Sequence, residues 1–169
     1  MRGALLTIVA CLALLVAGCG GDSSSTSGTS ASAPQEESTS AQQPEAAATK
    51  PTVKVPSGPP PKQLVTKDLK TGSGATAKAG DQVTVQYVGV GYESKEEFDA
   101  SWDRGEPFSF TLGAGEVIPG WDQGVEGMKV GGRRELIIPP ELAYGPAGAP
   151  PAIGPNETLI FVVDLVGVQ

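Results

Sequence analysis

Alternating apolar and polar side chains predict two β-strands in the second half of the chain. Residues 82–90 (QVTVQYVGV) and 107–112 (PFSFTL) both repeat with a period of two. That period is typical of a strand with one buried face. The side chains expected on the apolar faces are Val83, Val85 and Tyr87 in the first segment, and Phe108, Phe110 and Leu112 in the second.

Further strands are predicted on either side of these two. A short opening strand is expected around Val65 and Leu69, ahead of the turn residues 71–74 (TGSG). Residues 133–138 (RRELII) and 158–168 (TLIFVVDLVGV) predict two more strands.

One helix is predicted over residues 117–128 (VIPGWDQGVEGM). Pro119 lies near its first turn, where the missing N–H of proline costs least. Trp121, Val125 and Met128 recur at helical spacing and share a face. Residues 139–156 follow as a Pro/Gly/Ala-rich loop of 18 residues, long enough to carry function.

These elements predict the fold class α+β. Short strands at hairpin spacings favour an antiparallel β-sheet, and the single helix is expected to pack on one face of it. A parallel sheet is not expected, because the sequence has no repeated crossover helices.

The amino terminus is typical of a targeting signal. Residues 4–16 (ALLTIVACLALLV) form an apolar run of 13 residues, which suits a signal peptide and is too short to span a bilayer comfortably. The following residues 16–19 (VAGC) resemble the bacterial lipobox, which predicts cleavage after residue 18, lipidation of Cys19 and an extracytoplasmic, membrane-anchored protein at the cell surface or in the periplasm. The alternative is an ordinary secretory signal cleaved near Ala17 or Gly18, with Cys19 incidental.

Residues 20–61 have the composition of a linker. They contain no Leu, Ile, Phe, Trp or Tyr, and Val53 and Val55 are their only β-branched apolar residues. Such a segment cannot bury enough apolar surface to offset the entropy of ordering it. The predicted organisation is therefore a signal peptide (1–18), a lipidated Cys with a disordered linker (19–61) and one globular domain (62–169).

Charge and composition exclude several classes of function. The chain has 12 basic and 19 acidic residues, a net charge of −7 and no histidine. An acidic surface repels a phosphate backbone, so nucleic-acid binding is not expected. The absence of histidine removes Ser-His-Asp and Cys-His catalytic sites and the zinc sites that need histidine. No cofactor or metal is expected, and the protein is expected to be a monomer.

Six separated motifs resemble, in order, the FK506-binding (FKBP) type of peptidyl-prolyl cis/trans isomerase. They cover nearly all of the predicted domain. The motifs are residues 85–89 (VQYVG), 98–105 (FDASWDRG) with 107–110 (PFSF), 116–128 (EVIPGWDQGVEGM), 131–134 (GGRR), 138–145 (IPPELAYG) and 159–161 (LIF).

The resemblance implies a sheet half-wrapped around the short helix, with a shallow apolar pocket between them. It implies Trp121 as the pocket floor, aromatic walls from Tyr87, Phe98, Phe108 and Phe161, and a rim of Val117 and Ile118. The backbone N–H of Ile118 and the hydroxyl of Tyr144 would each bind a substrate carbonyl, Ile153 would close the far side, and Asp99 would lie at the reacting carbonyl, oriented by Arg104 and Tyr87. Ala149 stands where eukaryotic members commonly have His, which predicts altered ligand fit at that edge.

Rotation about an X–Pro amide suits a pocket without a nucleophile or a metal. The barrier of about 20 kcal/mol comes from amide resonance, and no bond is broken. The implied partners are proline-containing, unfolded or partly folded secreted proteins, and macrolide ligands of the family.

Several alternatives stay open on the sequence alone. Trp121 and Phe110 could be ordinary core residues, Tyr144 could be a turn aromatic, and Asp99 with Arg104 could be a surface ion pair of little energetic value. The competing function is a catalytically weak module that binds proline-containing peptides at the membrane.

Overall fold

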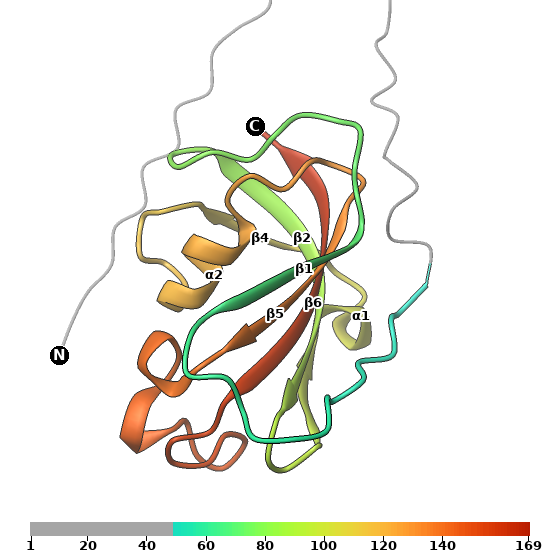
Figure 1. The fold of residues 1–169 in the computed structure, drawn as a ribbon. Helices are drawn as coiled ribbons and strands as arrows, with labels where there is room; N and C mark the ends of the chain where they lie inside the picture. Colours follow the sequence, from blue (N-terminus) through green and yellow to red (C-terminus); the bar gives the residue numbers. More distant parts are fainter. Residues whose placement is uncertain (1–48) are drawn as a thin grey trace, which may run out of the picture. The chain divides into compact units, whose positions relative to one another are not determined.

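The computed structural model describes residues 49–169, so the predicted signal peptide and Cys19 lie outside the described residues. Six antiparallel strands form one sheet in the order β1-β5-β6-β2-β3, and β4 also pairs with β2 (Figure 1). The strands are β1 (Val65–Lys70), β2 (Gln82–Gly91), β3 (Glu97–Ala100), β4 (Phe108–Thr111), β5 (Arg133–Ile138) and β6 (Leu159–Val168).

The helices are short. They are α1 (Ser101–Arg104), α2 (Pro119–Val125) and two 3₁₀ turns, Pro140–Leu142 and Gly145–Ala147. The predicted α+β class is confirmed. Among the helices of residues 49–169, only α2 is as long as seven residues, and it packs against the sheet. Residues 49–169 contain no helix whose length and apolar character would let it cross a bilayer.

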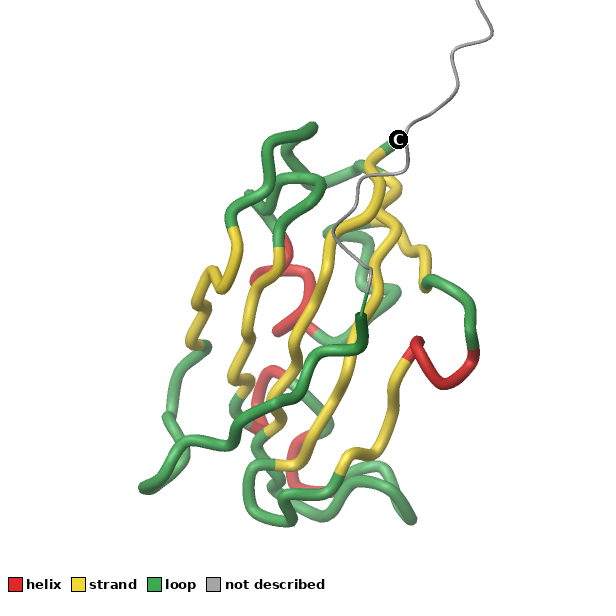
Figure 2. Tube along the Cα trace, turned by 90° about the vertical axis from the view of Figure 1, so that its right-hand side faces the viewer, coloured by secondary structure: helices red, strands yellow, loops and turns green. Residues whose placement is uncertain are grey.

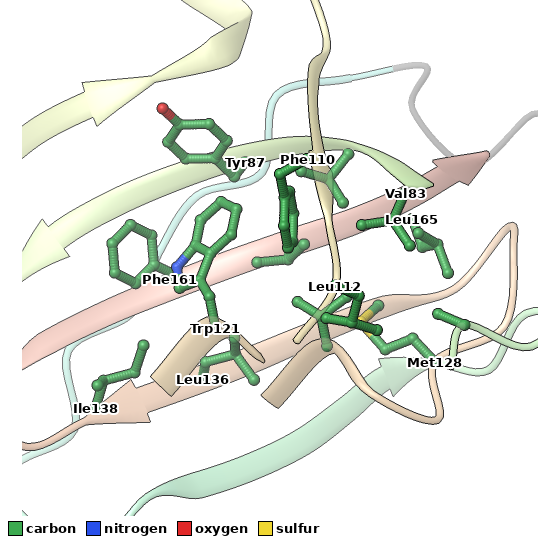
Figure 3. Packing of buried hydrophobic residues seen from close by; sticks show 14 of the residues in the cluster. Val83, Tyr87, Phe110, Leu112, Trp121, Met128, Leu136, Ile138, Phe161 and Leu165 are labelled. Carbon is green, nitrogen blue, oxygen red and sulfur yellow. The ribbon is translucent and has the colours of Figure 1, made fainter. Parts of the chain in front are cut away.

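The core lies between α2 and the inner face of the sheet (Figure 3). The alternation predicted for residues 82–90 is confirmed, because Val83 and Val85 are fully buried and Tyr87 is only 7% exposed. From β4, Phe110 is buried while Phe108 is 37% exposed, although the two rings stack with centroids 5.7 Å apart. Phe108 therefore continues the apolar face of β4 beyond the edge of the core.

Helix α2 begins as predicted, with Pro119 in its first turn, but it is shorter than expected. It ends at Val125 because Glu126 takes an extended conformation (ψ 136°) and Gly127 follows with a φ of +77°. Met128 is still buried, so it reaches the core from the chain segment after the helix.

Two glycines let α2 approach the sheet closely. A Cβ atom on Gly120 would lie 2.3 Å from Cγ2 of Ile138, and one on Gly124 would lie 2.7 Å from Cδ2 of Leu136. Both partners belong to β5, and the glycines are four residues apart, so they lie on one face of the helix. This contact brings Trp121 against the sheet.

The outer face of the sheet is covered by residues that precede the predicted domain. Residues 49–61 run across the strands (Figure 2), and Val53 and Val55 pack against Val88, Val90 and Ala100. The predicted linker extends to Pro61, and the structure differs from that prediction over these residues. The physical reason is that Val53 and Val55 pack on the apolar outer face of the sheet, a contact that the composition of the segment alone does not predict.

Candidate active site

Nine of the eleven predicted pocket residues line one cavity of about 390 Å³ beside α2. Six of the chain's nine aromatic side chains (four Phe, three Tyr and two Trp) take part in its wall. The lining residues are Tyr87, Phe98, Asp99, Phe108, Glu116, Val117, Ile118, Trp121, Tyr144 and Phe161.

Trp121 is the centre of the aromatic cluster. Its indole is 4% exposed and lies between Phe161 and Phe110 (Figure 3). The ring of Tyr87 meets it edge-on at 5.0 Å between centroids, and Phe161 does so at 5.2 Å. Edge-to-face pairs at these distances are favourable beyond their burial. The indole is therefore held rigidly, with one side of it forming part of the cavity wall.

A β-bulge brings two consecutive residues, Phe98 and Asp99, to the same cavity. In β3, Asp99 pairs with Gly89 and Glu97 pairs with Val90, so Phe98 is the extra residue of the bulge. In a regular strand, neighbouring side chains point to opposite faces. The bulge changes the direction of one of them, and the Phe98 ring packs edge-on against Phe161 at 5.5 Å.

Gly89 makes this arrangement possible, and the sequence reasoning missed it. A Cβ atom at this position would lie 2.7 Å from Cζ of Phe98 and 2.8 Å from Cε1 of Phe161. The signal that could have identified Gly89 is a glycine inside an otherwise β-branched strand, which often marks close approach by another group.

Three polar side chains form a network at the edge of the aromatic cluster. The hydroxyl of Tyr87 donates a hydrogen bond of 2.5 Å to Asp99 and accepts one of 2.8 Å from Arg104, which also forms an ion pair with Asp99. Burial raises the pKa of Tyr87 above its ordinary value, and the hydrogen bond to the Asp99 carboxylate raises it further. The hydroxyl therefore stays protonated at neutral pH and holds the carboxylate in place.

Arg104 does not line the cavity. It contacts the cavity only through Asp99 and Tyr87, with its guanidinium carbon 5.5 Å from the centre of the Tyr87 ring. Its two terminal nitrogens donate to different partners, one to Asp99 and one to Tyr87, which fixes the two side chains relative to each other. The geometry makes Arg104 a residue that orients Asp99.

The rim residues Val117 and Ile118 lie directly before α2. The Ile118 carbonyl accepts the N–H of Trp121 at 2.8 Å, which begins the helix. Among the described residues, no acceptor takes the backbone N–H of Ile118. The carboxylate of Asp122 accepts the backbone N–H groups of Gly113 and Gly115 and so holds the preceding turn against the helix.

Glu116 also lines the cavity, and it was not predicted as a site residue. Its carboxylate accepts the backbone N–H of Thr111 at 2.8 Å, which ties the end of β4 to the rim. The sequence offered only its position immediately before Val117, which does not reveal this contact.

The loop after β5 contributes one of its two predicted residues. Tyr144 lines the cavity and is 43% exposed. Ile153 is 5% exposed, packs into the core and does not line the cavity. It pairs with Ala149 through two backbone hydrogen bonds of 3.0 Å, which direct its side chain inward.

The cavity offers a ligand apolar contact and hydrogen bonding. Within residues 49–169, no group of three or more His, Cys, Asp or Glu side chains is placed to hold a metal ion. The polar groups that could contact a ligand include the Asp99 and Glu116 carboxylates, the Tyr144 hydroxyl and the Ile118 N–H. Such a set can orient an amide and lower the polarity around it.

Known proteins resemble this chain over the same residues. The family profile described as FKBP-type peptidyl-prolyl cis-trans isomerase matches residues 73–166. The FK506-binding protein of Streptomyces anulatus is 62% identical over 120 residues, which are 70% of this chain and 97% of that protein. The FK506-binding protein of Neisseria meningitidis is 49% identical over 105 residues, which are 62% of this chain and 95% of that protein.

Two crystal structures have the same fold. AtFKBP13 has a TM-score of 0.58 at 41% identity and covers 63% of this chain and 93% of its own. FkpA from Escherichia coli has a TM-score of 0.57 at 49% identity and covers 63% of this chain and 48% of its own. The Streptomyces match is longer than the stretch from Lys62 to Gln169, so it includes residues ahead of Lys62. With more than half of the chain matched by the family profile and nearly the whole of a 62% identical relative covered, this chain belongs to the FKBP-type peptidyl-prolyl cis-trans isomerase family.

Proposed function

We propose that the cavity lined by Trp121 is where this isomerase rotates X–Pro bonds, and that it does so in proteins outside the cytoplasm. One observation carries the placement of the active site: six aromatic side chains and two aliphatic ones enclose about 390 Å³ beside two carboxylates, of which Asp99 is held by Tyr87 and Arg104. A proline ring with its preceding carbonyl needs this combination of an apolar enclosure and a few polar groups.

An apolar enclosure favours the transition state of this reaction over its ground state. The planar amide separates charge onto its carbonyl oxygen, and water stabilises that charge. The twisted amide loses the separation, so moving the bond from water into an aromatic cavity penalises the planar form more. An acceleration of roughly 10⁴ to 10⁶ requires only about 5.5 to 8 kcal/mol of differential stabilisation.

The polar groups would fix the two ends of the bound segment. The backbone N–H of Ile118 makes no hydrogen bond to another described residue, so it would donate to a substrate carbonyl. The Tyr144 hydroxyl would donate to a second substrate carbonyl. Asp99, held by Tyr87 and Arg104, would lie beside the rotating carbonyl. The Tyr87 hydroxyl already donates to Asp99, so its role would be to position that carboxylate and not to contact substrate.

The amino-terminal sequence supports an extracytoplasmic location. Lipidation at Cys19 would anchor the protein, and the residues after it would keep the domain near the membrane, where secreted and envelope proteins fold. Prolyl isomerisation takes tens of seconds when uncatalysed, so an isomerase there would accelerate a slow folding step. The clients would be unfolded or partly folded chains that expose X–Pro bonds, and the apolar cavity would also admit macrolide ligands of the family.

The experiment is cis/trans exchange of an X–Pro peptide, followed by NMR with the full chain. We expect Trp121→Ala to remove most of the acceleration and Asp99→Ala to lower kcat by about tenfold or more. Leu69→Ala is the control, since Leu69 is a half-exposed apolar residue on β1, away from the cavity. Unchanged exchange in Trp121→Ala and Asp99→Ala would contradict the placement of the site. Saturable peptide binding without acceleration by the wild-type chain would favour the peptide-binding module.

A further inference from the structure

The segment ahead of the domain contacts the elements that carry Asp99 and Arg104. We call residues 49–55 the N-terminal strap. The ammonium group of Lys50 lies 2.6 Å from a carboxylate oxygen of Glu97 and 2.8 and 3.0 Å from the two oxygens of Asp103. One side chain therefore ties the strap to both β3 and α1, with sequence separations of 47 and 53 residues.

Both partners of Lys50 are immediate neighbours of site residues. Glu97 precedes Phe98, the bulged residue, and Asp103 precedes Arg104. A shift of β3 against α1 would change the distance between Asp99 and Arg104, because these two residues lie on the same pair of elements. The Lys50 contacts therefore hold β3 and α1 in the relative position that the Asp99–Arg104 ion pair requires.

The strap is held by apolar and backbone contacts as well. Val53 and Val55 pack on the cluster of Val88, Val90 and Ala100, which lies on the outer face of β2 and β3. At the other end of the strap, the Thr49 carbonyl accepts a hydrogen bond of 3.1 Å from Arg133, whose guanidinium also binds Asp164. These anchors keep Lys50 close to its two carboxylates.

On the site side, α1 is bound directly to Tyr87. The buried hydroxyl of Ser101 accepts the backbone N–H of Tyr87 at 2.8 Å. The hydroxyl of Tyr87 in turn donates to Asp99. The chain of contacts therefore runs from the strap through β3 and α1 to the polar network of the cavity.

We infer that Lys50 is a positioning residue for the isomerase site, acting through β3 and α1 on the pairing of Asp99 with Arg104. This inference rests on the proposed role of Asp99. It also gives the linker a function beyond that of a spacer, since residues 49–55 dock on the outer face of the sheet and complete the support of the site. The sequence shared with the Streptomyces relative, which extends ahead of Lys62, agrees with a strap that belongs to the folded unit.

The solvent exposure of the Lys50 ion pairs limits how much their loss can change kcat. The Lys50, Glu97 and Asp103 side chains are 36%, 37% and 61% exposed, so the contact is partly screened by water and salt. We therefore expect Lys50→Ala to lower kcat by about two- to fivefold with little change in KM. High salt should lower the wild-type kcat toward that of the variant.

The test is a double-mutant cycle in the full chain, measured by the same NMR exchange assay. The variants are Lys50→Ala, Asp99→Ala and both together, with Lys50→Arg as the rescue and Lys54→Ala as the matched control. Lys54 is an exposed strap lysine with no ion pair among the described residues. If Lys50 acts through Asp99, its substitution should lower kcat in the wild-type background and have no further effect in the Asp99→Ala background. The NMR signal of the Arg104 side-chain Nε–H should move in Lys50→Ala and stay unchanged in Lys54→Ala.

Each outcome separates the two proposals. A normal kcat and an unmoved Arg104 signal in Lys50→Ala, with Asp99→Ala impaired, would overturn the inference and leave the proposed active site intact. Lower thermal stability with unchanged kcat would do the same, because it would indicate a purely structural contact. An Asp99→Ala chain with wild-type activity would overturn the proposed site and the inference with it. Restoration of kcat by Lys50→Arg would support a charge contact.

Discussion

Gly89 lies between two site residues, opposite Asp99 on β3 and opposite Phe161 on β6, and the ring of Phe98 occupies the space where its Cβ atom would be. A side chain at this point would push on two of the cavity walls at once. Because Gly89 has no side chain, β2 can lie close to the bulge of β3 while the rings of Phe98 and Phe161 stay packed against each other. The aromatic wall depends on this backbone approach as much as on the aromatic residues themselves.

We predict that Gly89→Ala damages both the stability and the activity of the protein. The added methyl group would lie under 3 Å from Phe98 and Phe161, and overpacking of this kind costs about 1 to 3 kcal/mol. Displaced rings would also weaken substrate binding, so KM should rise. Urea unfolding and the NMR exchange assay measure the two effects.

Gly167→Ala is the matched control for this prediction. Gly167 also lies in a strand, and a Cβ atom there would be 3.6 Å from the nearest atom, which is ordinary contact. Equal behaviour of the two variants would show that the close approach at Gly89 is tolerated by movement of the rings.

The elements that could be predicted from the sequence are those with an undisturbed period. Strand β5 has the predicted bounds, β2 and β6 differ from theirs by one residue, and Pro119 marks the start of α2. Strand β3 was not predicted as a strand, because its four residues (EFDA) are too few to show a clear period and they begin at the end of a charged segment.

Other features depend on contacts between distant segments, which local patterns do not contain. Residues 49–55 have the composition of a linker, and only the outer face of the sheet gives Val53 and Val55 a place to pack. Ile153 was placed at the cavity by resemblance alone, within a loop that has no period. Its backbone pairing with Ala149 turns it into the core instead.

We predict that Tyr87→Phe lowers kcat by about three- to tenfold while KM changes little. The substitution keeps the ring that packs on Trp121 and removes the hydroxyl that binds Asp99 and Arg104. The carboxylate would then lose one of its two partners and gain freedom to move. Tyr92→Phe is the control, since its hydroxyl makes only long contacts of 3.4 and 3.5 Å to backbone carbonyls outside the cavity. A larger effect in the control than in Tyr87→Phe would argue against a role for the network.

We predict that Cys19→Ser releases the protein from the membrane. A lipid chain contributes about 0.8 kcal/mol for each buried CH₂ group, so its loss should move the chain from the detergent phase to the aqueous phase. Phase partition and the mass of the mature amino-terminal peptide measure this. A wild-type peptide that begins at Cys19 without added mass would instead indicate an ordinary secretory signal, with Cys19 incidental.

We predict that the pairing of Asp68 with Arg134 stabilises the fold at neutral pH and loses its effect in acid. The hydrogen bond from Arg134 lowers the pKa of Asp68 below its ordinary value of 3.8. A lowered carboxyl pKa adds stability above the unfolded value, and that stability is lost as the pH falls through the folded value. Asp68 is 47% exposed, so we expect Asp68→Asn to cost less than about 1 kcal/mol at pH 7.

The difference between wild type and Asp68→Asn in urea unfolding should therefore shrink as the pH falls below the unfolded pKa of Asp68 and disappear below its folded pKa. Glu106→Gln is the control, because Glu106 is exposed and has no ion pair among residues 49–169. Arg134→Ala should cost more, about 1 to 3 kcal/mol, since Arg134 also donates to the carbonyls of Gly124 and Glu126 at the end of α2. A difference for Asp68→Asn that persists unchanged at pH 3 would mean that the substitution acts through β1 packing and not through the charge of Asp68.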